Sequence, residues 1–126
     1  MFSNWAPQGR ILRPRARELV QRLFRAEGSV DSLPAGQHLL LVVQVEGLMW
    51  PKGQIQVNNG SWTAQVHEAG HPSDGLFVLS LWMVSSRGYG EVVAWLEHGG
   101  HTGEYPGLWQ IKDGVELHSI TLRLRA

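Results

Sequence analysis

The apolar residues of this chain fall in short segments separated by turns rich in glycine and proline. Residues 38–45 (HLLLVVQV) form a continuous run of leucine and valine between Gly36 and Gly47, which is typical of a strand buried on both faces. Residues 76–84 (LFVLSLWMV) form a second such run. Both segments are therefore predicted to be strands, and the second is the strongest strand signal in the chain.

A hairpin is predicted around the sequence Asn58-Asn59-Gly60. An Asn-Gly step supplies the positive φ angles that a tight turn between two strands requires. The short segment 54–57 precedes this turn, and residues 61–66 after it alternate polar and apolar side chains with a period of two. Residues 61–66 are therefore predicted to be extended, with Trp62 on the apolar face.

The end of the chain also alternates apolar and polar residues. Over residues 115–124 the apolar positions change phase between Leu117 and Ile120. One extra residue in a strand produces such a change, so a β-bulge is predicted near His118 and Ser119.

Two segments show helical spacing. In residues 91–98 (EVVAWLEH), three apolar residues recur at helical spacing and Gly99-Gly100 follows, where a helix C-cap would lie. This pattern predicts one short helix near residues 89–98. In residues 15–26, apolar residues recur at i, i+1, i+4 and i+5 after a proline. Periodicity favours a helix in that segment, and a strand remains the alternative.

Fifteen glycines and six prolines divide the 126 residues into pieces that suit strands joined by turns. A chain of this size has room for one core. Several amphipathic strands are buried most readily between two packed sheets. The predicted fold is therefore a mainly β, immunoglobulin-like antiparallel β-sandwich over residues 10–126, after an N-terminal tail at residues 1–9.

The charge balance limits the expected partners. Eleven basic and eleven acidic residues cancel, which argues against broad electrostatic binding to nucleic acid or to a membrane. Six arginines near the start predict a solvated basic face, with a phosphate-binding patch as the alternative: Arg10, Arg13, Arg15, Arg17, Arg22 and Arg25. The chain has no cysteine, no apolar run of the ~20 residues that span a bilayer and no secretory-signal pattern at its start. A cytoplasmic location is therefore expected.

Residues 67–71 (HEAGH) match the H-E-x-x-H pattern of zinc proteases. In those enzymes one helix presents both histidines to the zinc, and the glutamate acts as general base. Here a loop between strands is favoured, because Gly70 disfavours a helix and Pro72 disfavours the helical conformation at the preceding residue. We therefore predict no catalytic residue and no cofactor. A zinc site made by His67, Glu68 and His71 is the alternative.

Six tryptophans are more than such a length usually carries. Three of them lie in apolar phase with their elements and are predicted to be in the core: Trp62, Trp82 and Trp95. Trp50 and Trp109 lie beside or near prolines, where a tryptophan either fixes a loop to the sheets or offers a flat binding surface. Together with Tyr105, from the same loop as Trp109, they are the candidate binding residues.

From Trp50 to Leu124 the order of turns and apolar positions resembles an immunoglobulin-like accessory domain of bacterial multidomain proteins. The matching segments are a proline-led turn at Trp50-Pro51, a hairpin that closes on Gly60-Ser61-Trp62, a loop with Gly70, Pro72, Asp74 and Gly75, a strand with Phe77, a short helix that ends in Trp95-Leu96, residues 103–108 (GEYPGL) and a terminal strand with Arg123 and Arg125. Upstream, residues 11–28 resemble the opening of such domains, which implies a strand over residues 20–28, so this segment is expected to be extended despite its helical spacing.

The resemblance implies an adaptor or sensor module that accompanies caspase-like peptidase, nucleotide-binding or other effector domains and has no catalytic residues of its own. It also implies that residues 67–71 lie in a loop between strands. The expected function is a non-catalytic protein-interaction or adaptor module of a cytoplasmic bacterial assembly, with a protein partner. Two alternatives are open: a carbohydrate-binding module that uses Trp50 and Trp109 as stacking platforms, and a small zinc metalloprotease.

Overall fold

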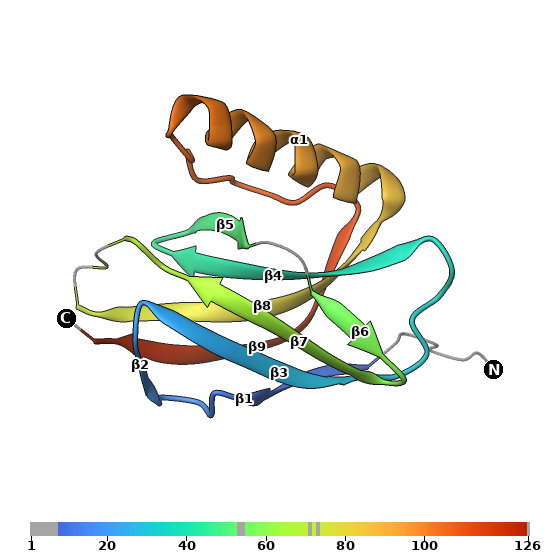
Figure 1. The fold of residues 1–126 in the computed structure, drawn as a ribbon, viewed down its shortest axis with the longest axis horizontal. Helices are drawn as coiled ribbons and strands as arrows, with labels where there is room; N and C mark the ends of the chain where they lie inside the picture. Colours follow the sequence, from blue (N-terminus) through green and yellow to red (C-terminus); the bar gives the residue numbers. More distant parts are fainter. Residues whose placement is uncertain (1–7, 53–54, 71, 73, 126) are drawn as a thin grey trace.

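Two β-sheets and one helix make up the computed structural model, which describes residues 8–52, 55–70, 72 and 74–125 (Figure 1). The four-stranded sheet has the order β1 (Gly9–Arg13), β3 (Leu23–Val30), β7 (Ser61–His67) and β6 (Gln56–Asn58). The five-stranded sheet has the order β2 (Leu19–Val20), β9 (Gly114–Leu124), β8 (Leu76–Ser85), β4 (Gln37–Val45) and β5 (Leu48–Lys52).

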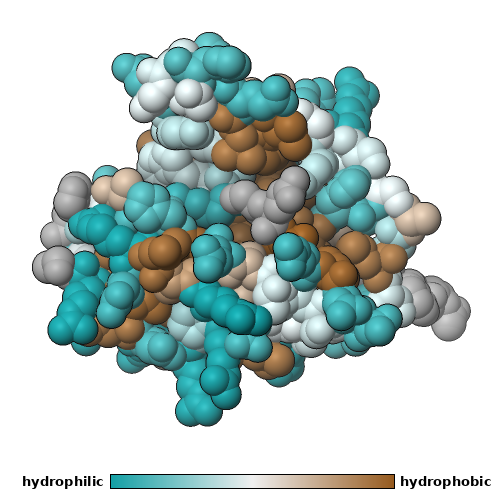
Figure 2. Space-filling view, viewed as in Figure 1, coloured by the Kyte–Doolittle hydropathy of each residue, from teal (hydrophilic) through white to brown (hydrophobic). Residues whose placement is uncertain are grey.

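The strand pairs described are antiparallel, apart from the parallel pair of β2 and β9. The mainly β prediction is confirmed. Helix α1 (Ser86–Thr102) lies over the outer face of the five-stranded sheet and forms a ridge above the strands (Figure 2). No helix in the described ranges is long and apolar enough to cross a membrane.

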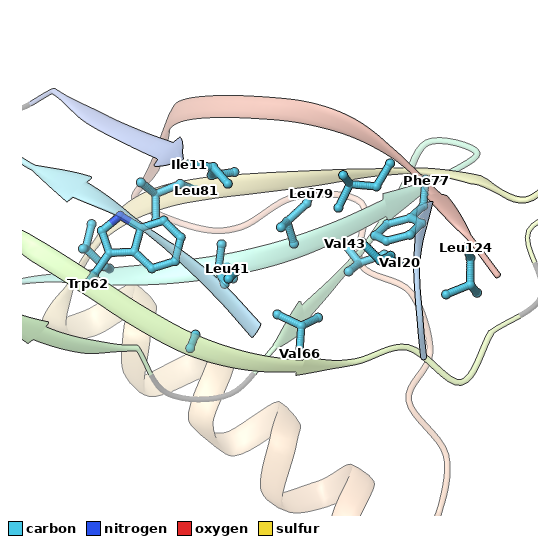
Figure 3. Packing of buried hydrophobic residues seen from close by; sticks show 14 of the residues in the cluster. Ile11, Val20, Leu41, Val43, Trp62, Val66, Phe77, Leu79, Leu81 and Leu124 are labelled. Atoms are coloured by element: carbon cyan, nitrogen blue, oxygen red, sulfur yellow. The ribbon is translucent and has the colours of Figure 1, made fainter. Parts of the chain in front are cut away.

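The larger hydrophobic core fills the space between the two sheets (Figure 3). Trp62 and Val66 of β7 face Leu41 and Val43 of β4 across this space. Trp62 is the largest of the fully buried side chains. Because the apolar side chains alternate along each strand, one face of each sheet supplies this core.

A smaller core lies between the five-stranded sheet and the helix. Leu40 and Val42 of β4 pack there with Val84 of β8 and Val92 of α1. Strand β4 therefore has apolar residues on both faces, and the prediction of a doubly buried strand at residues 38–45 is confirmed.

Two tight turns set the register of the hairpins. Asn59 and Gly60 have φ angles of 48° and 83° and connect β6 to β7, as the Asn-Gly step predicted. Glu46 and Gly47, with φ angles of 51° and 81°, form an equivalent turn between β4 and β5. The predicted bulge in β9 is also present, because Leu117 is the extra residue between the partners of Leu81 and Trp82.

Residues 15–26 are not helical, so the interpretation based on periodicity was wrong. The segment contains β2 and the start of β3. Its helical spacing was created partly by Leu19 and Leu23, whose side chains are exposed, whereas Val20 and Ala26 are buried. The strand that the resemblance implies over residues 20–28 is largely formed, because β3 covers residues 23–30.

The helix is longer than the predicted segment 89–98. It begins after Ser85, whose side chain accepts a hydrogen bond from the Gly88 N–H, and it ends at Gly103, which has a φ of 78°. Gly99 and Gly100 were expected to end the helix but lie inside its last turn. Gly99 lies against the ring of Tyr105, which leaves no room for a side chain at this position of the helix.

Candidate functional site

A groove of about 710 Å³ opens between helix α1, strand β5 and the end of strand β7. We call it the α1–β5 groove. The residues that matter for its chemistry are Trp50, Lys52, His67, Glu68, Trp95 and Tyr105. In Figure 2, apolar surface is visible directly beneath the ridge formed by α1. Preformed cavities of this size with few polar groups are typical of ligand-binding sites.

Two tryptophan indoles hold the loop that follows the helix. The Trp50 Nε1–H donates to the carbonyl oxygen of Tyr105 at 2.8 Å, and the Trp95 Nε1–H donates to the carbonyl oxygen of Pro106 at 3.2 Å. The rings of Trp95 and Tyr105 meet edge to face, with centroids 5.4 Å apart. Three aromatic side chains from β5, α1 and the loop are thus fixed relative to one another.

Two glycines allow this packing. A Cβ atom at Gly99 would overlap the ring of Tyr105, and one at Gly107 would lie 2.8 Å from Trp50 Cζ2 and from Leu48 Cβ. The loop therefore approaches the helix and β5 more closely than a side chain at either glycine would permit. Gly100, one position further along α1, has open space around it.

Alanine substitutions at the two neighbouring helix glycines are expected to have opposite effects. Gly100→Ala should raise the free energy of unfolding by roughly 0.5–1 kcal/mol, because alanine is the better helix former. Gly99→Ala should lower it by about 1–3 kcal/mol, because the new methyl group displaces the Tyr105 ring. Urea denaturation followed by circular dichroism measures both. Stabilisation by Gly99→Ala would show that Tyr105 does not pack on the helix.

The polar part of the groove is organised around Lys52. Its ammonium group donates to the His67 carbonyl oxygen at 2.9 Å and to Glu68 Oε1 at 3.1 Å. The Glu68 residue is only 7% exposed. Because an ammonium group has three N–H donors, these two bonds to described residues leave one donor for a ligand.

Arg22 anchors the segment behind this ion pair. Its Nη1 donates to the carbonyl oxygens of Glu68 and Gly70, at 2.9 and 2.8 Å. The Glu68 N–H in turn donates to the Arg22 carbonyl oxygen at 2.8 Å. The backbone that places Glu68 in the groove is therefore tied to the segment before β3.

The helical arrangement required by a zinc protease is not formed at residues 67–70. His67 is the last residue of the extended strand β7, and Glu68 is bonded to Lys52. His71 lies outside the described residues. Within the described ranges, no three histidine, aspartate or glutamate side chains are grouped as metal ligands.

The groove brings together two of the three candidate binding residues. Trp50 and Tyr105 line it, whereas Trp109 does not and is 79% exposed. Trp62 is in the core as predicted. Trp95 was also expected in the core, but its side chain is half-buried and faces the groove. Lys52 was not recognised, because its partner Glu68 is brought beside it by the pairing of distant segments.

Comparison with protein-family models gives no match, and comparison with curated proteins gives none either.

Proposed function

We propose that this chain is a non-catalytic interaction module that binds a short segment of a partner protein in the α1–β5 groove. The observation that supports it is the aromatic lining from Trp50, Trp95 and Tyr105 beside the remaining donor of Lys52. Aromatic residues in a concave site supply large contact areas at a low cost in conformational entropy.

The geometry favours a peptide ligand with an apolar side chain. The aromatic rings offer apolar surface for such a side chain, and the Lys52 ammonium group offers a hydrogen bond to a peptide carbonyl oxygen. The lining is fixed by hydrogen bonds within the protein, so little ordering is needed when a ligand binds.

We also propose a role for the chain within a larger assembly. The two sheets and the turn pattern are compatible with an immunoglobulin-like accessory domain, and such a domain would act as an adaptor in a cytoplasmic bacterial assembly. In that role the groove would hold the partner, and the sheets would serve as the rigid support.

Filling the groove should weaken peptide binding. A random dodecapeptide library selected on the whole protein is expected to yield peptides of micromolar affinity that contain an apolar or aromatic anchor. Ala69 is exposed and lines the groove, so Ala69→Trp should weaken these peptides by more than about tenfold. Fluorescence polarisation measures the affinities.

Ala94→Trp is the matched control, because Ala94 is exposed on α1 and is not part of the groove lining. It should change the affinities by less than about twofold. Selected peptides that bind both variants equally well would place the binding site elsewhere. If no peptide is enriched and a glycan array gives binding that Ala69→Trp removes, the groove belongs to a carbohydrate-binding module instead.

A further inference from the structure

A second hollow, of about 550 Å³, lies at the corner where β1, β2 and β3 meet. We call it the arginine corner and define it by Arg13, Arg15, Arg25, Leu19 and Leu23. These strands lie together at the edge of the molecule away from α1 (Figure 1). The corner shares no lining residue with the α1–β5 groove, but the two are neighbours, because Leu23 and Arg25 pair across the sheet with His67 and Gln65 of that groove.

The arginine side chains of this corner have no partner among the described residues. Among the described residues, the ion pairs join Lys52 to Glu68 and Lys112 to Glu91, and neither pair involves an arginine of the corner. Glu18, which also lines the hollow, uses its carboxylate to accept the backbone N–H of Arg15 at 3.0 Å. The guanidinium groups of the corner are thus available for charge-assisted hydrogen bonds.

Exposed leucines accompany these arginines. Leu19 and Leu23 are 51% and 59% exposed and line the same hollow. The neighbouring Leu12 of β1 is also exposed. Large apolar side chains grouped on a surface and surrounded by polar residues are typical of interaction sites.

The neutral net charge of the chain conceals a separation of charge. Arg17 and Arg123 lie close to the corner, because their backbone N–H groups donate to Thr121 and to Glu18. Many of the acidic residues lie instead on α1 and in the segments after it: Glu91, Glu97, Glu104, Asp113 and Glu116. An acidic ligand is therefore attracted to one edge of the protein.

We propose that the arginine corner binds an acidic, leucine-containing segment of a partner protein. The leucines line a concave surface, which side chains of a peptide can enter and which a flat bilayer contacts poorly. Glu18 and Glu27 also line the hollow, and they oppose a continuous polyanion such as a nucleic-acid backbone. A peptide whose carboxylates are spaced by apolar residues fits both the concave surface lined by leucines and the mixed charges of the hollow.

A labelled synthetic peptide in which single glutamates alternate with single leucines is the probe. It should bind the full chain with an affinity that falls as salt is added. Arg13→Glu combined with Arg15→Glu should weaken binding by more than about tenfold. Leu23→Ser and a peptide with serine in place of leucine should each weaken it by about threefold or more. Arg25→Glu, on β3, tests the same corner if the double variant does not fold.

Arg87→Glu is the control, since Arg87 is an exposed arginine of α1. It should change the affinity by less than about twofold. Equal losses in Arg87→Glu and in the corner variants would overturn the proposal, as would tighter binding to duplex DNA or to phosphatidylserine vesicles than to the peptide. Ala69→Trp, which fills the α1–β5 groove, should leave this binding unchanged, and this result would distinguish the corner from the neighbouring groove.

Discussion

Replacing Trp62 by alanine is expected to lower the free energy of unfolding by about 3–5 kcal/mol. The side chain is 1% exposed and packs between the two sheets, against the backbone of Gly28. Its Nε1–H donates to the carbonyl oxygens of Arg10 and Ser29, with the nitrogen 3.2 Å from each oxygen. The substitution removes the largest fully buried side chain, leaves a cavity and takes a donor from two backbone acceptors.

Trp109→Ala makes the same chemical change at a position that is 79% exposed. It should change the free energy of unfolding by no more than about 0.5 kcal/mol. Urea denaturation followed by far-ultraviolet circular dichroism measures both variants without depending on tryptophan fluorescence. Equal costs at the two positions would mean that the core between the sheets does not depend on Trp62.

The central strands can be predicted from the sequence because local patterns of residues determine their conformation. The run at residues 38–45 requires burial on both faces, and β4 provides it between the inter-sheet core and the helix. The Asn59-Gly60 step requires positive φ angles, and the turn between β6 and β7 uses them. In both cases a few neighbouring residues are enough to define the conformation.

The edge strands are predicted poorly because distant pairing decides them. β2 has two residues and pairs in parallel with the end of β9, which no local pattern reveals. Trp50-Pro51 was interpreted as a turn, yet both residues lie in β5. A proline is tolerated there because β5 is the last strand in its sheet.

In the candidate site too, local patterns predicted some residues, and packing between distant segments placed the others. Aromatic residues near prolines pointed to Trp50 and Tyr105, which do meet in the α1–β5 groove. The contribution of Trp95 depends on the length of α1 and on the return of the loop after Gly103. The role of Lys52 depends on the position of β5 beside the end of β7. These relations arise from packing between the sheets and the helix, so residue types alone do not reveal them.

The ion pair of Lys52 and Glu68 is expected to contribute far more to the free energy of unfolding than the exposed pair of Lys112 and Glu91. Lys52→Met should lower the free energy of unfolding by about 3 kcal/mol, because it leaves the Glu68 carboxylate buried without its partner. The matched variant Lys112→Met breaks the pair with Glu91. In this pair the Lys112 Nζ and the Glu91 Oε1 are 3.9 Å apart, and both side chains are about half exposed. That change should cost less than about 1 kcal/mol.

A double-mutant cycle separates the ion pair from the packing of the lysine side chain. Combining Lys52→Met with Glu68→Leu should recover more than half of the stability lost in Lys52→Met, since no uncompensated charge then remains. The cycle is measured by urea denaturation of the four proteins. A double variant that is as unstable as the sum of the single variants would show that the two groups do not interact. The Lys52 ammonium group would then have two donors for a ligand, because the third is bonded to the His67 carbonyl oxygen.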